Sequence, residues 1–308
     1  MNRDRQSLLV LGGGGFIGSA FCEWAWQQGF RVTACAYDDR LARPLPDGVI
    51  FVTADATDPG EMKRVVAEAK PDAVVFAISQ INPRSETKAS DTQLLAEMRS
   101  ILNTLEAMGA NGCRRLVYIS SAGAVYGAGE GIFREDQACH PRSFYGKLKL
   151  ETERLIETLA GRMRTHYTIL RVSNPYGPGQ NPLGTQGVIP IFMRRILNGE
   201  PIEILGSDQA SKDYLYIDDL AEVIGRAVMQ CDNRIYNIGS GEGTTLAQII
   251  ERIEAACGRR AEKIFRPLPE QEVPSFAIDT RQAAERLGWR PMIGLEEGIG
   301  RLHAWMTR

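Results

Sequence analysis

The sequence predicts an α/β fold built on a doubly wound parallel sheet, followed by a smaller C-terminal α/β lobe. Three observations predict it. Short apolar runs alternate with helical patterns through the first half of the chain, which is typical of parallel strands covered by helices on both faces. Glycines directly follow the first of these runs and precede the first helical pattern. After about residue 175 the alternation gives way to proline- and glycine-rich sequence with shorter elements.

The elements of the first half follow from these patterns in order. Predicted strands, short and mostly apolar, cover residues 8–11, 31–36, 49–53, 73–77, 115–120 and 166–172. Predicted helices cover residues 17–28, 58–70, 92–108 and 143–159. Gly29 and Pro71 end the first two helices, because glycine forms a C-terminal cap and proline cannot continue a helix. This order of strands and helices is typical of repeated βα units.

The second half of the chain is less regular. Strand patterns occur at residues 202–205 and 235–238, and helical patterns occur at 218–231, 246–257 and 281–287. The chain contains no internal repeat and no low-complexity tail. We expect these elements to form a smaller lobe that packs on the sheet rather than an independent domain.

Composition narrows the class of protein. With 308 residues, 44% hydrophobic and 24% charged, the chain matches an ordinary globular protein, which excludes a disordered or collagen-like one. A net charge of −2 gives no strong attraction to nucleic acid or to an anionic membrane. No apolar run approaches the roughly 18–20 residues of a membrane span, and the start lacks the apolar stretch of a signal peptide. We expect a cytoplasmic protein without nucleic-acid or membrane partners.

The cysteines and histidines form no metal-binding pattern. Six cysteines are scattered along the chain without a CxxC spacing, and there are only three histidines. We therefore expect no metal site. Free, mostly buried thiols are the simplest interpretation, and they fit a reducing cytoplasm.

Gly12, Gly15 and Gly18 follow the first predicted strand and open the first predicted helix. In this context the first glycine permits a tight turn, the second lets a pyrophosphate approach the backbone, and the third lets helix and strand pack closely. The N-terminus of a helix also offers N–H groups and a partial positive charge to phosphates. The spacing predicts a dinucleotide site in a Rossmann-like fold; the alternative is a glycine-rich turn without a ligand.

The residues after the second strand bear on which dinucleotide binds. An acid near the end of that strand favours NAD, because it binds the adenosine ribose; Asp38 and Asp39 follow Ala36, where the acid is expected. Arg40 comes next and suits the additional phosphate of NADP. We predict NAD and leave NADP open; a polar turn is the alternative for the two aspartates. The full predicted dinucleotide set is Gly12, Gly15, Phe16, Ile17, Gly18, Asp38, Asp39, Asp55, Ala56, Phe76, Ala77, Tyr145 and Lys149.

Tyr145 and Lys149 stand four residues apart on a predicted helix, so they share one helix face. An ammonium beside a phenol favours the phenolate and lowers the phenol pKa below its ordinary value of about 10. Tyr145 is therefore a candidate acid/base for a sugar hydroxyl or carbonyl, and Lys149 a candidate ligand of the nicotinamide ribose. The pair follows a strand ending in Ser120 and Ser121, at the sheet edge where open α/β folds bind ligands. A chance pair of surface residues is the alternative.

Six motifs follow one another over nearly the whole chain: GGGGFIG, SSAGAVYG, SFYGKLK, LRVSNPYGPG, KDYLYIDDLA and YNIGSGEGTTL. In this order they resemble the extended short-chain dehydrogenases/reductases, in particular the NAD-dependent sugar epimerase/dehydratase branch and its UDP-hexose 4-epimerases. The resemblance implies that Tyr145 removes a proton from a sugar hydroxyl while hydride passes to NAD+. The transient keto sugar then takes the hydride back on its other face.

The resemblance also implies roles for other parts of the chain. A serine or threonine would hydrogen-bond the reacting oxygen, and Ser121 is our candidate. Ser120, Asn174 and Lys212 would contact the nucleotide sugar. Residues 1–175 would bind the dinucleotide and carry the active-site helix, whereas residues 176–308 would mainly bind substrate. The helices at 92–108 and 143–159 would form a homodimer interface, with packing within one subunit as the alternative.

The sequence departs from the family pattern in four places. Ala122 stands where the family usually has its hydroxyl, which is why Ser121 and Ser120 are considered instead. Residues 97–99, Glu-Met-Arg, replace an asparagine-rich segment, and Lys212 replaces an arginine. The stretch at 267–274 is acidic and lacks a further family arginine, although Arg266 lies nearby. These departures concern the substrate more than the hydride chemistry.

Three functions remain open from the sequence. An NAD-dependent nucleotide-sugar 4-epimerase comes first, and an NAD(P)H-dependent reductase or dehydrogenase of a related sugar comes second. The third is a dinucleotide-binding regulatory protein without catalysis, which the shifted serine favours and the intact Tyr145–Lys149 pair disfavours. A dehydratase is disfavoured because Gly123 and Ala124 stand where that reaction needs an acid.

Overall fold

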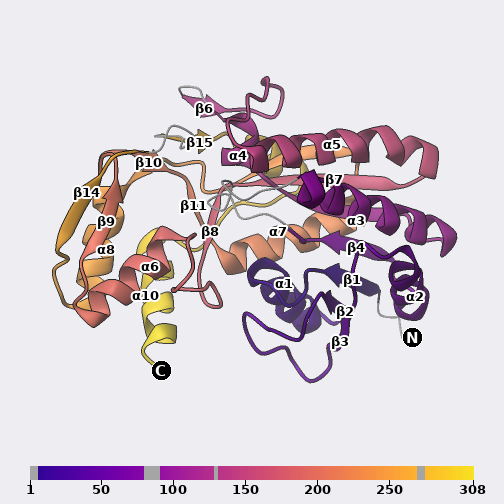
Figure 1. The fold of residues 1–308 in the computed structure, drawn as a ribbon, viewed down its shortest axis with the longest axis horizontal. Helices are drawn as coiled ribbons and strands as arrows, with labels where there is room; N and C mark the ends of the chain where they lie inside the picture. The colour runs from indigo at the N-terminus through magenta and orange to yellow at the C-terminus, as the bar shows by residue number, and fades with distance from the viewer. Residues whose placement is uncertain (1–5, 80–90, 128–130, 269–274) are drawn as a thin grey trace.

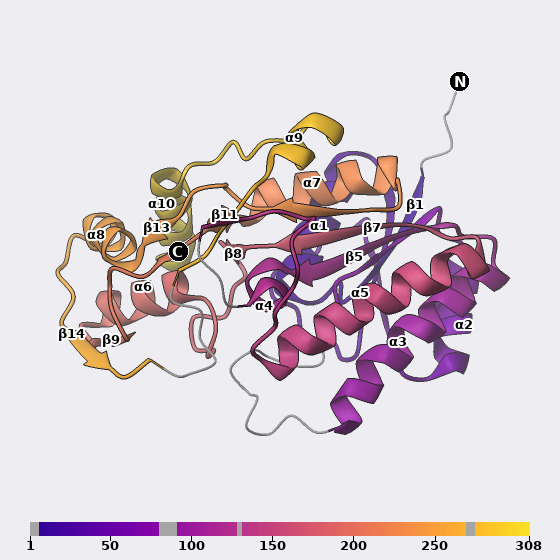
Figure 2. The ribbon, with the colours of Figure 1, turned by 90° about the horizontal axis from the view of Figure 1, so that it is seen from above.

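A seven-stranded parallel sheet forms the centre of the molecule (Figures 1 and 2). The computed structural model describes residues 6–79, 91–127, 131–268 and 275–308. Across the sheet the strands lie in the order β12 (Arg234–Ile238), β7 (His166–Val172), β5 (Arg115–Ser121), β4 (Ala73–Phe76), β1 (Ser7–Leu11), β2 (Arg31–Ala36) and β3 (Ile50–Thr53). The order reverses between β1 and β4, so the predicted doubly wound α/β fold is confirmed.

Helices cover both faces of this sheet (Figure 1). One face carries α1 (Phe16–Gln27) and α7 (Ile217–Gln230), which pack against each other. The other face carries α2 (Pro59–Ala69), α3 (Asp91–Ala110) and α5 (Phe144–Met163). Because both faces are covered, the central strands are apolar on both sides, as the sequence predicted.

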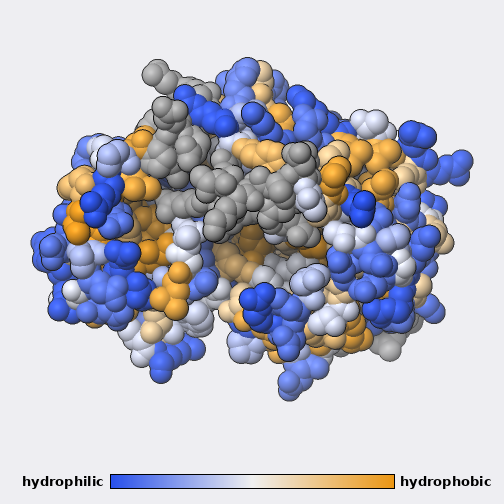
Figure 3. All heavy atoms as spheres, viewed as in Figure 1, coloured by the Kyte–Doolittle hydropathy of each residue, from blue (hydrophilic) through white to orange (hydrophobic). Residues whose placement is uncertain are grey.

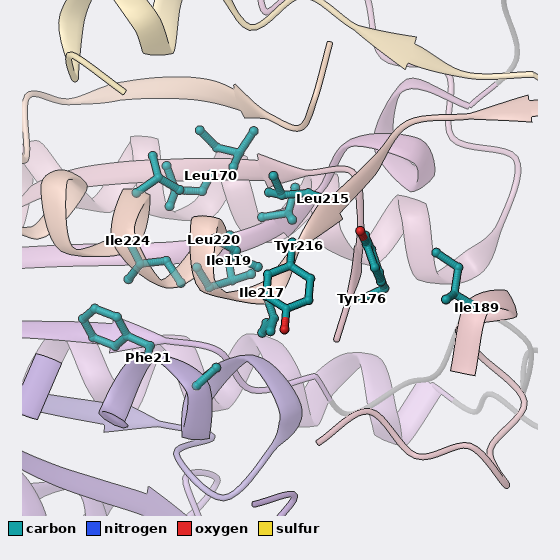
Figure 4. Close-up of a cluster of buried hydrophobic side chains, with 14 of the residues drawn as sticks. Phe21, Ile119, Leu170, Tyr176, Ile189, Leu215, Tyr216, Ile217, Leu220 and Ile224 are labelled. Atoms are coloured by element: carbon teal, nitrogen blue, oxygen red, sulfur yellow. The ribbon is translucent and has the colours of Figure 1, made fainter. Parts of the chain in front are cut away.

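In strand β1, alternate side chains point to opposite faces of the sheet and pack in different hydrophobic clusters. Leu8 and Val10 join the hydrophobic cluster beside α1 and α7, whereas Leu9 and Leu11 join the cluster beside α2 and α3. All four side chains are fully buried. Figure 4 shows the first cluster, in which Phe21 lies with side chains of β5, β7 and α7.

The smaller lobe stands at the end of the sheet where α4 and β8 lie (Figure 2). Its helices α6, α8 and α10 pack on one another. Their bounds are α6 (Val188–Asn198), α8 (Leu246–Cys257) and α10 (Leu295–Met306). The short strands and remaining helices are α4 (Ala122–Tyr126), β6 (Ile132–Phe133), β8 (Asn174–Tyr176), β9 (Ile202–Leu205), β10 (Ser211–Lys212), β11 (Tyr214–Tyr216), β13 (Thr244–Thr245), β14 (Lys263–Arg266), β15 (Ala277–Ile278) and α9 (Arg281–Arg286).

Two elements expected in the smaller lobe belong to the sheet instead. Strand β12 pairs with β7 along its whole length, and α7 covers the sheet beside α1. The physical reason is burial: Tyr236 and Ile238 are fully buried, and pairing with β7 in the central sheet covers them. The sequence analysis also missed α6 and α10. Pro190 does not prevent α6, because it lies in the first helical turn, where the backbone N–H has no partner in the helix.

One hydrophobic core joins the two parts of the molecule. The cluster that contains Leu8 of β1 also contains Ile249 of α8 and Leu302 of α10. Between them, the rings of Tyr176 and Tyr216 meet edge to face, with centroids 5.6 Å apart (Figure 4). On the face seen in Figure 3, the surface is hollowed between the smaller lobe and the part that holds the sheet. Among the described residues, no helix is both long and apolar enough to cross a membrane.

Candidate active site

The glycine-rich turn joins β1 to α1. The N–H groups of Gly12 and Gly13 donate to the Cys35 carbonyl at 2.8 and 2.9 Å, and Gly12 has a φ of +84°. A Cβ on Gly18 would lie 2.1 Å from the Gly12 carbonyl oxygen. The third glycine therefore lets α1 start directly against the turn.

The turn and the start of α1 form a cradle of backbone groups. Gly15 is the N-cap, no side chain caps the helix, and its first turn contains no acidic residue. The N–H groups of this first turn, including those of Phe16 and Ile17, are the ones that a helix leaves without internal partners. From the other side, Ala77 follows Phe76 at the end of β4, and its carbonyl would be 2.8 Å from a Cβ on Gly12. The cradle fits the pyrophosphate of a dinucleotide.

The segment after β2 folds over this turn. The Ala42 N–H donates to the Gly14 carbonyl at 2.8 Å. Beside it, Asp38 accepts hydrogen bonds from the Arg40 backbone N–H at 3.1 Å and from its Nε at 2.8 Å. These hydrogen bonds lower the pKa of Asp38. The acids expected to bind ribose, Asp38 and Asp39, thus share one exposed edge with the arginine that suits NADP.

Asp55 and Ala56 form the loop between β3 and α2. One Asp55 oxygen accepts the Thr57 N–H at 2.8 Å, and the Asp55 N–H donates to Glu61 at 2.7 Å. The Asn103 side chain of α3 donates to the Ala56 carbonyl at 3.0 Å. This loop, which carries Asp55 and Ala56 of the predicted dinucleotide set, is therefore held by its own helix and by α3.

Tyr145 and Lys149 lie on the face of α5 that turns toward α3 and β5. Ser143 caps the helix by accepting the Gly146 N–H at 2.9 Å, so Tyr145 falls in the first turn. Tyr145 is 9% exposed and Lys149 is fully enclosed. The Lys149 Nζ lies 5.7 Å from the centre of the Tyr145 ring. The structure therefore brings the predicted acid/base and its ammonium together.

A buried carboxylate completes this group. Glu97 of α3 accepts a hydrogen bond from Lys149 Nζ at 2.8 Å and one from the Tyr118 hydroxyl at 3.2 Å, both at Oε1. The Lys149 Nζ also donates to the Ile78 carbonyl at 3.5 Å and lies 5.0 Å from the Tyr118 ring centre. Sequence reasoning noted Glu97 only as a departure from the family pattern and did not place it in the site.

The surroundings of Lys149 keep it charged. Burial acts to lower its pKa, but the Glu97 carboxylate and the phenols of Tyr118 and Tyr145 act more strongly in the other direction, so the pKa stands well above its ordinary value. Burial raises the pKa of Tyr118 well above its ordinary value. At neutral pH Lys149 is therefore an ammonium and Tyr118 a buried neutral phenol.

The two serines at the end of β5 have different surroundings. Ser121 is the N-cap of α4 and is half-buried, and its hydroxyl makes no capping hydrogen bond. Ser120 is buried, and its hydroxyl donates to Glu153 of α5. Ala122, at the family's usual hydroxyl position, is fully buried. Ser121 is thus the serine nearer to solvent at this edge.

Glu153 belongs to a second buried network that ties α5 to the sheet. It pairs with Arg171 of β7 at 2.7 Å, and both side chains are at most 5% exposed. Arg171 donates to the Tyr126 hydroxyl at 3.0 Å, and this hydroxyl donates to Asn237 of β12 at 2.8 Å. Sequence reasoning did not identify this network, because its members come from four separate elements.

Asn174 and Lys212, the residues expected to contact substrate, lie close together. Strands β8 and β11 pair so that Asn174 faces Tyr214, and the Asn174 side chain donates to the Asp213 carbonyl at 2.7 Å. Asp213 is buried and accepts the N–H groups of Ser240 and Gly241 at 2.8 and 2.9 Å. The motif around Lys212 is therefore fixed from within by Asp213, another residue that sequence reasoning missed.

Two expectations concern absences. Among the described residues, no group of three or more metal-ligating side chains could hold a metal ion. In the same part of the chain, every cysteine is a free thiol, and Cys22, Cys35, Cys113 and Cys231 are buried. Residues 269–274 of the acidic stretch lie outside the described residues.

Comparison with known proteins identifies the family. The family model described as "NAD dependent epimerase/dehydratase family" matches residues 8–239. The chain belongs to the NAD-dependent epimerase/dehydratase family. This confirms the resemblance seen in the ordered motifs, and NAD as the cofactor of the family fits the glycine cradle.

Two curated relatives match over almost their whole length. A dTDP-4-dehydro-6-deoxyglucose reductase of Escherichia coli is 31% identical over 310 residues, which cover 98% of each chain. A putative UDP-glucose 4-epimerase of Methanocaldococcus jannaschii is 31% identical over 304 residues, which cover 97% of this chain and 98% of the relative. Both matches extend over the part that holds the central sheet and over the smaller lobe.

Solved structures of the family share the whole fold. UDP-glucose 4-epimerase of Thermotoga maritima with UDP-glucose is 30% identical, with a TM-score of 0.93 and coverage of 97% of this chain and 98% of that one. UDP-glucose 4-epimerase of Thermus thermophilus in complex with NAD is 28% identical, with a TM-score of 0.91 and the same coverage. The chain is therefore an NAD-dependent enzyme of the extended short-chain dehydrogenase/reductase type.

Proposed function

We propose that the chain is an NAD-dependent nucleotide-sugar 4-epimerase in which Tyr145 is the acid/base. The observation that carries this proposal is the placement of Tyr145 beside the Lys149 ammonium, 5.7 Å from its ring centre. The pair stands next to β5, at the sheet edge that also holds the glycine cradle. The T. maritima and T. thermophilus UDP-glucose 4-epimerases support the reaction class, as does the M. jannaschii relative described as a putative UDP-glucose 4-epimerase.

The chain's own residues would handle the proton and orient the sugar. Tyr145 as phenolate accepts the proton of the C4 hydroxyl, and as phenol it returns the proton to the keto oxygen. Lys149 stabilises the phenolate by its charge. Ser121 hydrogen-bonds the reacting oxygen. When bound, NAD supplies the hydride acceptor and donor at C4, held by Gly12, Gly15, Phe16, Ile17 and Gly18.

The smaller lobe would hold the rest of the substrate. Lys212 offers a point charge to a diphosphate, and Asn174 beside it offers an amide. Asn174 lies on β8, which pairs with β11, and Lys212 lies on β10, two residues before β11 begins. The assignment of residues 1–175 to dinucleotide binding and of residues 176–308 mainly to substrate binding is thus part of this proposal. Because β12 and α7 return to the sheet, the substrate residues come from the remainder of the second half.

Product analysis tests the proposal. The protein is incubated with UDP-glucose, UDP-galactose and their N-acetyl forms in turn, with catalytic NAD+, and the products are separated by anion-exchange chromatography. We expect one pair to interconvert without net formation of NADH. Tyr145→Phe should lower kcat by about 10²- to 10⁴-fold, the usual contribution of a general acid/base, while NAD+ binding persists. No interconversion of any of the four sugars would contradict the proposal.

A nucleotide-sugar ketoreductase is the second candidate. The E. coli relative, 31% identical over 98% of the chain, is described as a dTDP-4-dehydro-6-deoxyglucose reductase, and this match favours the alternative. Arg40 next to the glycine turn also suits NADPH. The test offers that 4-keto sugar with NADH or NADPH and follows absorbance at 340 nm. Stoichiometric consumption of the reduced dinucleotide selects the reductase, because an epimerase recycles its cofactor.

We also propose a cytoplasmic homodimer. Helix α3 packs on α5 and still presents Leu95 and Leu102 with 59% and 36% exposure. Exposed leucines on α3, beside α5, suit a helix-to-helix subunit interface. The free thiols of the described residues suit a reducing compartment. Sedimentation equilibrium tests the dimer, and a charged substitution at Leu95 should yield monomers.

A further inference from the structure

The buried carboxylate of Glu97 is not needed for the proton transfer proposed above. Its side chain is fully buried, and Oε1 lies 2.8 Å from Lys149 Nζ. A carboxylate placed this far from water is stable only when it is paired and hydrogen-bonded. Lys149 and the Tyr118 hydroxyl provide these partners. Glu97 and Lys149 therefore form a buried ion pair directly beside Tyr145.

Several titratable groups of the described residues lie near Lys149 or on the elements packed against α5. Among the described residues, the groups that act on Lys149 are Glu97 from α3, Tyr118 from β5 and Tyr145 from its own helix. On α4 and β7, Tyr126 and Arg171 belong to the Glu153 network, whereas His166 and Tyr167 lie at the other end of β7 and contact Asn233 and Glu157. Among the described residues, Glu97 is thus the carboxylate that pairs with the ammonium next to Tyr145.

We infer that Glu97 is a positioning residue that fixes the Lys149 ammonium and offsets its charge, so that Tyr145 stays a phenol to higher pH than beside an unopposed ammonium. This inference rests on the proposed function, in which Tyr145 transfers the proton. The phenol is the form that donates a proton when a keto sugar is reduced. Glu97 therefore favours the reductive half of the reaction at neutral pH, at the expense of the oxidative half.

Glu97→Gln tests this directly, because it removes the charge and keeps the shape. The pKa of Tyr145 is measured by NMR on protein labelled with ¹³C at tyrosine Cζ, and Tyr145→Phe assigns the signal among the nine tyrosines. We expect the Tyr145 pKa to fall by about one unit in Glu97→Gln, as a neighbouring ammonium loses its counter-charge. An unchanged or higher pKa would overturn the inference.

Two controls separate charge from packing. Glu153→Gln breaks a buried ion pair of similar geometry on α5 itself and should leave the Tyr145 pKa within a few tenths of a unit of the wild-type value. Glu97→Asp keeps the charge and should lie between wild type and Glu97→Gln. An equal shift in Glu97→Asp and Glu97→Gln, or in Glu153→Gln, would show that disturbed packing moves the pKa and would overturn the inference.

The double variant Glu97→Met/Lys149→Met covers the case in which Glu97→Gln does not fold. Apolar residues replace buried ion pairs without loss of folding in several proteins. If the two charges oppose each other at Tyr145, removing both should raise its pKa by less than about one unit. A larger rise would show that Lys149 acts unopposed, and the inference would be wrong.

The titration is independent of the substrate. If the pKa of Tyr145 shifts but no nucleotide sugar is converted, the role of Glu97 stands and the proposed function is wrong. If sugars are epimerised but the pKa of Tyr145 does not shift, the proposed function stands and the inference about Glu97 is wrong. In an active protein, the acid limb of the kcat/KM profile for sugar oxidation should move to lower pH in Glu97→Gln, together with the NMR pKa.

Discussion

At Gly18 the turn leaves no room for a side chain. A Cβ there would lie 2.1 Å from the Gly12 carbonyl oxygen and 2.9 Å from the Gly13 Cα, both backbone atoms that cannot rotate away. Gly18→Ala should therefore push α1 from the turn, lower the free energy of unfolding by roughly 1–3 kcal/mol and abolish NAD+ binding. Urea denaturation and isothermal titration calorimetry with NAD+ check the two effects.

Gly161 provides the matched control for this prediction. It lies in α5, and nothing stands within 4 Å of the position its Cβ would take. Gly161→Ala should leave NAD+ binding unchanged and stabilise the protein by up to about 1 kcal/mol, because alanine is the better helix former. If both variants lost NAD+ binding alike, the close approach at Gly18 would not be the cause.

Single residues show what a pattern can and cannot predict. The glycines and the Tyr145–Lys149 pair lie close in sequence, so local spacing predicted their neighbourhood, and the structure bears this out for the turn and for the pair. Glu97 is 52 residues from Lys149, and only the packing of α3 on α5 reveals their contact. Ser120 was expected at the substrate, but its hydroxyl is bound to Glu153, a partner 33 residues away.

Helix α5 is fixed to the sheet by the ion pair between Glu153 and Arg171. Both side chains are buried, so Glu153→Ala leaves the Arg171 guanidinium without a counter-charge. The variant should lose roughly 3–5 kcal/mol of folding free energy, whereas Ser120→Ala, which removes one hydrogen bond to the same carboxylate, should lose about 1 kcal/mol. Guanidinium denaturation measures both. Equal losses would mean that the ion pair does not anchor α5.

At the level of elements, patterns located most of the sheet but misassigned its last strand. Residues 235–238 look like any short strand, and their distance from the other strands in sequence placed them in the wrong lobe. Their true neighbour is β7, where Ile235 meets Ile169. Helix α6 was missed because proline and glycine surround it, although Pro190 occupies a turn where proline is tolerated.

At the level of the whole molecule, the shared core predicts cooperative unfolding. The same cluster holds Val10 of β1, Ile253 of α8 and Leu302 of α10, so neither part keeps its core without the other. We expect one thermal transition, with coincident midpoints by far-UV circular dichroism and by tryptophan fluorescence. NAD+ at about 100 times its Kd should stabilise the folded protein by about 2.7 kcal/mol. Both midpoints should therefore rise together. Two separate transitions would show independent domains.

Buried phenols predict how stability depends on alkaline pH. Burial raises the pKa of Tyr126 to about 12 and that of Tyr118 well above its ordinary value. Between about pH 10 and 12 the unfolded chain releases these protons and the folded chain retains them, so stability falls as pH rises, by about 1.4 kcal/mol per pH unit for each group. Lys149 acts in the same direction. Its pKa is raised in the fold, so its contribution is complete below the unfolded value and is lost above it.

Urea unfolding at about pH 8 and about pH 11 measures this dependence, with Tyr126→Phe as the informative variant. Tyr126→Phe should be less stable at both values, because Arg171 and Asn237 each lose a hydrogen-bond partner. Its stability should nevertheless decline less steeply between them, since one titrating phenol is gone. Equal slopes would show that Tyr126 ionises in the folded protein, and hence that the network around Arg171 opens at high pH before the molecule unfolds.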